Sequence, residues 1–420
     1  MIENKSPKSF EKILRASVIG QDEGIRTVAI AISSHLIRIN HNRNNPSNPI
    51  QKDNLLILGP TGSGKTESFR TVVRAFNLPV PMAIVSTGTL TADGYKGKNV
   101  SSILDELIRD SLRIINKDPS LYIGKPDNEE ERKMRIEKAV IKLANTGIVI
   151  LDEFDKIRID PFKDDHDNFF PQTAQRQLLK MIEGVTGIGE DRPGNLIDTT
   201  DILFVATGAF VGLDEVMQER LCPQPRLEAP HIGFMSEDKR PVEAEVQNGS
   251  IDMRSLLSTT EDLINYGFIP ELVGRIPLRC RYNELSEEAL CRILHDSAIS
   301  PAKGFQRLFG ANGNRLVFTG DALRDVAGKA FSMHTGARAL RSVIAQIVYP
   351  IFYDLSDMTG MRVLITSETV NYGCPPVVTV YNEGEGGKEY WKVDDLEADR
   401  ETVAEKNKSE KSAPAWHPWN

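Results

Sequence analysis

A glycine-rich segment that follows a short apolar run constrains the fold of this chain more than any other feature. Residues Gly59–Thr66 read GPTGSGKT, which matches the phosphate-binding pattern GxxxxGK followed by Ser or Thr. The apolar run Asn54–Leu58 predicts a strand before it, and a helix is expected from about Glu67. Glycines let backbone N–H groups turn towards phosphates, and the helix N-terminus adds the positive end of its dipole. This context predicts a nucleotide-binding loop.

Two side chains of this loop have separate expected tasks. The Lys65 ammonium would contact the β and γ phosphates, and the Thr66 hydroxyl would bind Mg²⁺. The expected cofactors are therefore ATP and Mg²⁺. The residues predicted to form the phosphate site are Gly59, Pro60, Thr61, Gly62, Ser63, Gly64, Lys65 and Thr66.

A second apolar run, Gly147–Leu151, ends in two acidic residues, Asp152 and Glu153. A strand that ends this way places both carboxylates at the carboxyl edge of a sheet. Asp152 would hold Mg²⁺, and Glu153 would orient and polarise the attacking water. A solvated acidic pair would be the better interpretation if the phosphate-binding loop were absent. With the loop present, the pair favours a hydrolase over a protein that only binds nucleotide.

The rest of the chain predicts an α/β domain followed by a smaller one. Short apolar runs at Val80–Val85 and Asp201–Ala206 alternate with helical stretches, which is typical of a parallel sheet flanked by helices. After about Cys280 the pattern becomes mainly helical, and strands are expected only around residues 362–366 and 376–380. The fold class is therefore a P-loop α/β domain with a small α+β domain behind it.

These patterns divide the chain into four parts. A lead-in of residues 1–53 contains an amphipathic helix, Asp22–Ile39, and then a polar loop. The large ATPase domain is expected over 54–282 and the small domain over 283–380, with helices at Ser286–Ile299, Asp321–Phe331 and Ala337–Leu355. Residues 381–420, rich in Glu, Lys, Gly and Ser, are expected to be a disordered tail.

Composition excludes several classes of protein. The formal net charge of −8 argues against a general nucleic-acid binder, which usually has a basic balance or a basic face. No apolar run approaches the length needed to cross a bilayer, and the polar start does not resemble a signal peptide. We expect a cytoplasmic protein that does not contact membranes.

Segments spread along the chain are similar, in order, to those of the ClpX family of AAA+ ATPases, from about residue 10 to about residue 355. The related HslU family shares some of them, whereas the GARALRS segment and the tripeptide Ile232-Gly233-Phe234 favour ClpX. Besides the phosphate-binding loop and the segment 147–157, the similar segments are 18–21 (VIGQ), 177–184 (QLLKMIEG), 197–213 (IDTTDILFVATGAFVGL), 269–277 (IPELVGRIP), 283–290 (NELSEEAL) and 335–342 (TGARALRS).

The resemblance implies further roles in the ATPase site. Val18 and Ile19 match the segment that lies against adenine. Arg275 matches the arginine finger, which reaches the γ-phosphate of a neighbouring subunit. Arg338 matches the sensor-2 arginine of the small domain, and Thr207 falls where a sensor-1 polar group is expected. An arginine supplied in trans makes hydrolysis depend on assembly, because it completes the neutralisation of the transition-state charge.

Two further segments match surfaces that contact other proteins. Tyr95 and Lys96, between two glycines, match the first pore loop, in which an aromatic ring grips a polypeptide by shape and apolar contact. Lys96 stands where the family has a hydrophobic residue. Ile232, Gly233 and Phe234 match the loop that inserts an apolar side chain into a pocket of the ClpP peptidase.

The chain also departs from the family. No counterpart of the amino-terminal zinc domain is recognised. The loop that is basic in ClpX would fall near 187–195, and here it carries only Arg192 against Glu190 and Asp191. A charged helical insertion lies around Asp127–Lys142. These differences concern the choice of substrate and adaptor and leave the ATPase residues unchanged.

We therefore interpret the sequence as the ATPase subunit of a ClpP-type protease. It would form a homo-hexamer, unfold protein substrates and thread them through a central pore, with no peptidase activity of its own. A remodelling ATPase that works without a peptidase is the alternative. A nucleic-acid motor such as a helicase loader is disfavoured by the acidic balance and by the pore tyrosine.

Overall fold

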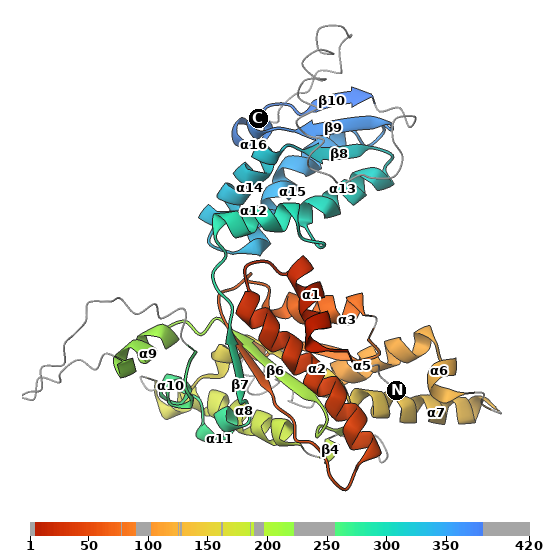
Figure 1. The fold of residues 1–420 in the computed structure, drawn as a ribbon, viewed down its shortest axis with the longest axis vertical. Coiled ribbons are helices and arrows are strands. Elements are labelled where there is room, and N and C mark those ends of the chain that lie inside the picture. Colours follow the sequence, from red (N-terminus) through yellow and green to blue (C-terminus); the bar gives the residue numbers. More distant parts are fainter. Residues whose placement is uncertain are drawn as a thin grey trace, which may run out of the picture. The chain divides into compact units, whose positions relative to one another are not determined.

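The computed structural model describes residues 5–76, 78–89, 102–124, 126, 128–160, 163–184, 186–188, 197–221 and 257–380. Figure 1 shows its helices and strands. By its internal contacts the chain divides into two compact units, each drawing on separate parts of the sequence. The first unit comprises Met1–Asn40, Gly59–Pro79 and Tyr282–Asn420. The second comprises His41–Leu58 and Val80–Arg281.

The second unit is built on a parallel sheet of five strands in the order β2-β3-β6-β1-β7. The central strands are buried along almost their whole length, which explains their continuous apolar sequences. This sheet confirms the predicted α/β class. Its strands are β1 (Leu55–Leu58), β2 (Met82–Ser86), β3 (Ile148–Asp152), β6 (Leu203–Gly208) and β7 (Leu278–Arg281).

Helices pack against this sheet and against one another. The helix α5 (Ser102–Lys117) lies on β2, and α7 (Glu129–Ala144) lies on α5. The helix α8 (Asp165–Glu183) packs against η1 (Phe154–Ile157) and α11 (Pro270–Gly274). The remaining elements of the unit are α6 (Ser120–Ile123), β4 (Thr186–Ile188), β5 (Ile197–Asp198), α9 (Leu213–Leu221) and α10 (Thr260–Tyr266).

A cluster of aromatic rings lies in the core directly after the acidic pair. Phe154 stacks on Phe268 with ring centroids 5.1 Å apart and planes 4° from parallel. Phe210 and Tyr266 pack beside Phe268. The cluster joins the end of β3 to the chain between α10 and α11, so aromatic contacts fix both segments.

The first unit combines the amino-terminal helices with the phosphate-binding loop and the carboxyl-terminal part of the chain. The helix α1 packs on α3, and α14 packs on α12, α15 and α16. The unit also contains the three-stranded sheet β10-β9-β8. The elements are α1 (Pro7–Ser17), most of α2 (Asp22–Asn44), α3 (Lys65–Ala75), α12 (Glu287–His295), α13 (Pro301–Ala311), β8 (Arg315–Phe318), α14 (Gly320–Ser332), α15 (Ala337–Asp354), β9 (Met361–Ile365), α16 (Ser367–Tyr372) and β10 (Val377–Val380).

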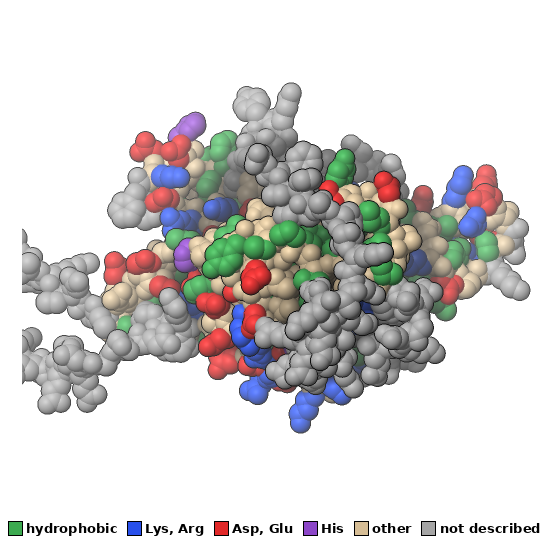
Figure 2. Space-filling view, turned by 90° about the horizontal axis from the view of Figure 1, so that it is seen from above, with side chains coloured by type: hydrophobic (Ala, Val, Ile, Leu, Met, Phe, Trp, Pro, Cys, Tyr) green, Lys and Arg blue, Asp and Glu red, His purple; other side chains and the backbone are tan. Residues whose placement is uncertain are grey.

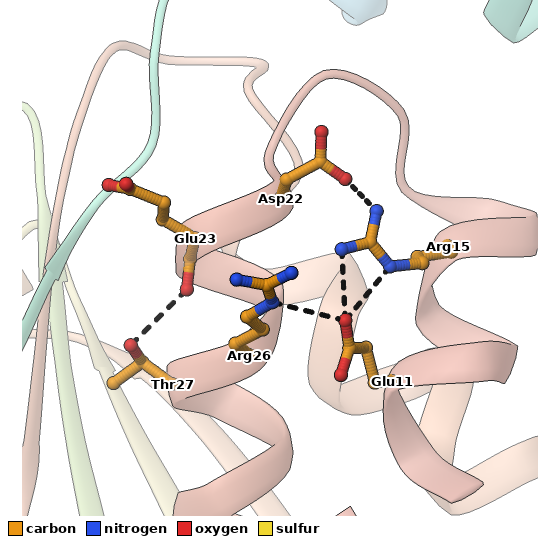
Figure 3. A network of polar contacts seen from close by, with 6 residues as sticks. All are labelled: Glu11, Arg15, Asp22, Glu23, Arg26 and Thr27. Carbon is orange, nitrogen blue, oxygen red and sulfur yellow. Dashed lines mark hydrogen bonds and ion pairs between the residues drawn. The ribbon is translucent and has the colours of Figure 1, made fainter. Parts of the chain in front are cut away.

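An exposed network of ion pairs joins α1 to α2 (Figure 3). Glu11 accepts from Arg15 at 2.9 Å and from Arg26 at 3.3 Å, and Arg15 also pairs with Asp22. The hydrogen bond from Arg15, followed by the one from Arg26, outweighs partial burial and holds the pKa of the Glu11 carboxyl below its ordinary value. The network connects the two helices that flank Val18 and Ile19.

Several element boundaries differ from the prediction. The segment from Asn40 was expected to be a loop, but α2 continues to Asn44 because the Asn42 amide bonds to both backbone groups of Ile50. The helix α1 was not predicted, although Ser6 caps it and Pro7 occupies its first turn. The charged insertion begins as a helix only at Glu129, where the Asn128 side chain accepts from the Glu131 N–H.

None of the helices within the described ranges is both long and apolar enough to cross a membrane. In the view of Figure 2, acidic and basic side chains are both visible beside hydrophobic ones. Charge of a single sign does not dominate the part of this face that the structure describes.

Candidate active site

The phosphate-binding loop is shaped by close backbone contacts within the first unit. Gly59 has φ +143°, and a Cβ there would lie 2.3 Å from the Tyr282 carbonyl oxygen. Gly62 has φ +78°, and a Cβ there would lie 2.4 Å from the Thr335 carbonyl oxygen. Both positions therefore require glycine on grounds of space and of backbone conformation. These glycines allow the loop to be held tightly by residues from a distant part of the sequence.

The Lys65 side chain lies within the loop that precedes it. Its ammonium donates to the carbonyl oxygens of Gly59 at 2.7 Å and Pro60 at 2.8 Å, and Lys65 is only 8% exposed. The Ser63 hydroxyl donates to Pro60 as well, at 2.8 Å. A positive charge is thus placed at the start of α3, where the helix dipole already favours an anion.

The start of α3 is fixed by a buried contact that sequence reasoning missed. The Ser68 hydroxyl lies 2.7 Å from the Tyr282 hydroxyl and also bonds to the Gly64 carbonyl oxygen. Ser68 and Tyr282 are fully buried. No local signal indicates this pair, because the two residues lie more than two hundred positions apart in the sequence.

The segment predicted to lie against adenine packs on the loop. Val18 and Ile19 are buried, and a Cβ on Gly64 would lie 3.2 Å from the Val18 side chain. The neighbouring Gln21 amide exchanges two hydrogen bonds with the Asn283 backbone, at 2.8 and 2.7 Å. The structure thus brings Val18 beside the predicted phosphate-binding loop.

The predicted sensor-2 segment also contacts the loop. The Ala337 N–H donates to the Gly62 carbonyl oxygen at 3.1 Å, directly before Arg338 in the first turn of α15. Arg338 is exposed, and its guanidinium bonds to no other residue within the described part of the chain. A cation in the first turn of a helix is electrostatically unfavourable unless an anion lies near it. This placement suits an arginine that contacts a phosphate.

In the second unit, the acidic pair stands at the carboxyl end of β3. Glu153 adopts the left-handed conformation, with φ 55° and ψ 38°, and it caps the short helix η1. The Asp152 carboxylate accepts from the Thr207 hydroxyl at 2.7 Å and from the Glu153 N–H at 3.0 Å. A residue other than glycine in this conformation is held there by its surroundings, and such residues cluster at functional sites.

Two hydroxyl groups at the end of β2 hold Glu153 in this conformation. The Ser86 hydroxyl donates to the Glu153 carboxylate at 2.5 Å, and the Thr87 hydroxyl donates to the Glu153 carbonyl oxygen at 2.7 Å. Neither residue is predicted from the sequence. Ser86 lies opposite Asp152 in the parallel register. The sequence signal that could have found it is a polar residue at the end of the strand next to the one that carries the acidic pair.

Arg275 caps α11 and points to solvent from the second unit. Its side chain is 57% exposed and forms an ion pair with Glu183 at 2.9 Å. Within the described residues, no hydrogen bond joins Arg275 to Asp152 or Glu153. The structure therefore does not place Arg275 on the acidic pair of its own chain.

The segments predicted to contact other proteins fall outside the described residues. They are Tyr95 and Lys96, the tripeptide Ile232-Gly233-Phe234 and most of the loop near 187–195. The tail from residue 381, which was predicted to be disordered, also lies outside the described residues. The chain on either side of residues 222–256 is described, and a partly buried ion pair joins its two sides. Arg220, in α9, donates to both carboxylate oxygens of Asp262, in α10, at 2.7 and 3.1 Å.

Replacing Asp262 by alanine is expected to lower the free energy of unfolding by about 2–4 kcal/mol. Burial opposes ionisation of this carboxyl, but the hydrogen bonds from Arg220 and Thr259 outweigh it and lower its pKa. Its contribution is therefore present above the pKa of an unfolded Asp and is lost as the pH falls through the folded pKa. Urea unfolding of the variant at neutral pH measures the difference.

Glu261→Ala is the matched control, because Glu261 lies in the same turn and is exposed. We expect this change to alter the free energy of unfolding by less than about 0.5 kcal/mol. Equal stabilities of the two variants would show that the ion pair does not fix the chain at this place.

Comparisons with known proteins agree with this geometry. A model of the family described as "AAA domain (Cdc48 subfamily)" matches residues 50–279. A protein of Treponema denticola described as "ATP-dependent Clp protease ATP-binding subunit ClpX" is 33% identical over 389 residues. The match covers 90% of this chain and 84% of that protein. The similarity therefore extends far beyond the phosphate-binding loop and includes most of both units.

Proposed function

Because this chain belongs to the ClpX family of AAA+ ATPases, we propose that its ATP hydrolysis drives the unfolding and translocation of proteins. The observation that carries the hydrolytic part of the proposal is the position of Glu153, strained into the left-handed conformation and bonded by Ser86. A carboxylate held in this way at a strand end can orient a water molecule for attack on a phosphate.

The predicted site residues suit the chemistry of Mg-ATP hydrolysis. Lys65 would neutralise the β and γ phosphates, and Arg338 would contact the phosphates. Val18 and Ile19 would form the apolar surface for adenine. Mg²⁺ prefers oxygen ligands, which Thr66 and Asp152 would each offer, and it would neutralise charge on the phosphates.

We propose that Arg275 acts on the nucleotide of a neighbouring subunit in a homo-hexamer. Its exposed position on α11 and its lack of contact with the acidic pair of its own chain support this role. An arginine supplied by a neighbour couples hydrolysis to assembly. The ring would then be the active form.

The mechanical part of the proposal rests on family resemblance. Tyr95 and Lys96 would contact the translocating polypeptide in the pore. Ile232, Gly233 and Phe234 would dock on a ClpP-type peptidase, which would degrade the unfolded chain. The same resemblance supports a cytoplasmic location. One departure, the loop near 187–195 with only Arg192 against Glu190 and Asp191, leaves room for a second candidate, a remodelling ATPase that acts without a peptidase.

Changes in the pore and in the docking loop should separate these candidates. Tyr95→Ala is expected to hydrolyse ATP while failing to unfold a folded reporter, because the ring that grips the chain is lost. Changing Ile232 and Phe234 together to serine should leave ATP hydrolysis and unfolding intact. An apolar side chain buried in a pocket contributes about 1.5–3 kcal/mol, and the loops of one ring act together, so degradation by the peptidase should be lost.

The measurement is the loss of reporter fluorescence, with and without a ClpP-type peptidase, alongside ATP hydrolysis. Full degradation by the docking-loop variant would reject the peptidase partner and favour the remodelling ATPase. Normal unfolding by Tyr95→Ala would reject threading through the pore.

A further inference from the structure

We infer that Glu183 is the positioning residue of Arg275, which it holds ready for the nucleotide of the neighbouring subunit. The inference rests on the proposed action of Arg275 in trans. It assigns a role in ATP hydrolysis to a carboxylate at the end of α8 that contacts no nucleotide itself. Three features of the second unit support it: the fixed backbone at Arg275, the geometry of the ion pair, and the place of Glu183 in its helix.

The backbone at Arg275 is fixed from the interior of the sheet. The Asn54 amide donates to the Arg275 carbonyl oxygen at 2.7 Å and accepts from the Phe204 N–H at 3.1 Å. Asn54 is only 2% exposed, and its own carbonyl oxygen accepts from Leu278. A single buried residue, through its side chain and its backbone, thus ties the Arg275 backbone to β1, β6 and β7. The backbone of Arg275 is therefore fixed, and only its side chain remains to be ordered.

The ion pair with Glu183 holds one edge of the Arg275 guanidinium. Arg275 donates through Nε at 3.1 Å and through Nη2 at 2.9 Å, and both bonds go to the same oxygen of Glu183. Within the described residues, Nη1 donates to no acceptor. A guanidinium has five N–H donors in a rigid plane, so holding one edge leaves the other directed outward. This arrangement presents the Nη1 edge of Arg275 for a phosphate.

The position of Glu183 in its helix would be electrostatically unfavourable without its contact with Arg275. It is the last residue of α8, where the negative end of the helix dipole repels a carboxylate. The next residue, Gly184, has φ +103°, and a Cβ there would lie 3.1 Å from the Thr200 hydroxyl. The close contact between Gly184 and Thr200 therefore fixes the end of α8. The Glu183 carboxylate stays at this end of the helix. The Arg275 guanidinium offsets the repulsion.

The pair contributes little to the stability of the fold. The side chains of Arg275 and Glu183 are 57% and 39% exposed, and ion pairs with such exposure are worth little in water. Removing the carboxylate should therefore leave the protein folded and assembled. Its effect is expected on the hydrolysis step, for which the orientation of Arg275 matters.

The test compares Glu183→Ala, Glu183→Gln and Arg275→Ala as full-length, assembled proteins supplied with Mg-ATP. Glu183→Ala is expected to lower kcat about 10-fold, because a misplaced catalytic group costs up to about 100-fold, while KM and the melting temperature stay unchanged. Glu183→Gln should restore most of kcat, since its amide oxygen can accept both bonds. The control is Glu106→Ala, which removes an exposed ion pair of equal length, 2.9 Å, from the same unit.

The double variant shows whether Glu183 acts through Arg275. Glu183→Ala combined with Arg275→Ala should be no slower than Arg275→Ala alone. A kcat of Glu183→Ala equal to that of the control or above the wild type, or a double variant in which the two losses multiply, would overturn the inference alone. Wild-type hydrolysis by Arg275→Ala would reject both the action of Arg275 in trans and the role of Glu183.

Discussion

Replacing Glu153 by glutamine is expected to slow steady-state ATP hydrolysis by about 10²–10⁴-fold while leaving ATP binding intact. The amide keeps the size of the side chain and can still accept from the Ser86 hydroxyl, so the strained conformation should persist. What the variant loses is the negative charge that polarises the attacking water. Turnover is measured by phosphate release and affinity by equilibrium binding of a fluorescent ATP analogue.

Lys65→Ala is expected to affect nucleotide binding, whereas Glu153→Gln affects hydrolysis. It removes the buried ammonium that lies within the phosphate-binding loop, so nucleotide binding itself should weaken. Lys12→Ala, on the exposed face of α1, is the control that should change neither quantity. Near-normal turnover by Glu153→Gln would show that this carboxylate does not orient the water.

Replacing Arg275 by alanine is expected to reduce kcat by about 10³-fold or more, with ATP still bound. The loss removes positive charge that the neighbouring site needs in the transition state. Hydrolysis per subunit should also rise with protein concentration through the range in which subunits assemble, since a monomer lacks the arginine of a neighbour. Both quantities are measured by phosphate release across a dilution series.

Mixing two inactive variants tests the same interface. Subunits with Arg275→Ala retain Glu153, and subunits with Glu153→Gln retain Arg275. In an equal mixture roughly one interface in four combines an intact carboxylate with an intact arginine from the neighbour, so some hydrolysis should return. A mixture as inactive as its components, together with hydrolysis per subunit that does not depend on concentration, would place the whole site within one chain.

The parts of the site that the sequence predicted are those set by local patterns. The phosphate-binding loop is a strand, a glycine-rich turn and a helix within a short stretch, and each part has its own signal. The acidic pair follows a buried strand, which is also a local pattern. The order of the strands, β2-β3-β6-β1-β7, explains why segments far apart in sequence end at the same edge.

The parts that the sequence did not reveal are long-range partners. Ser86 bonds to Glu153, Tyr282 to Ser68, and Glu183 to Arg275 across separations of 67, 214 and 92 positions. Such pairs depend on which strands and helices become neighbours in the fold. A serine or a glutamate that forms one of them looks, in the sequence, like any other polar residue.

Helix ends were mispredicted for a related reason. The helix α2 passes Ile39 because Asn42 bonds to Ile50 and to Asp201, and these contacts override the polar composition of the segment. Propensity and capping residues set the start of a helix well, as Ser6 and Asn128 show. The end of a helix depends more on the tertiary contacts that its last turn makes.

The most direct test of the account follows a folded fluorescent reporter that carries an unstructured extension. The account predicts that its fluorescence falls when the assembled protein receives Mg-ATP. It predicts no loss with a non-hydrolysable analogue, or when Glu153→Gln replaces the wild type. Loss of fluorescence that persists without hydrolysis would contradict the claim that ATP hydrolysis drives unfolding, and so would rapid hydrolysis that leaves the reporter folded.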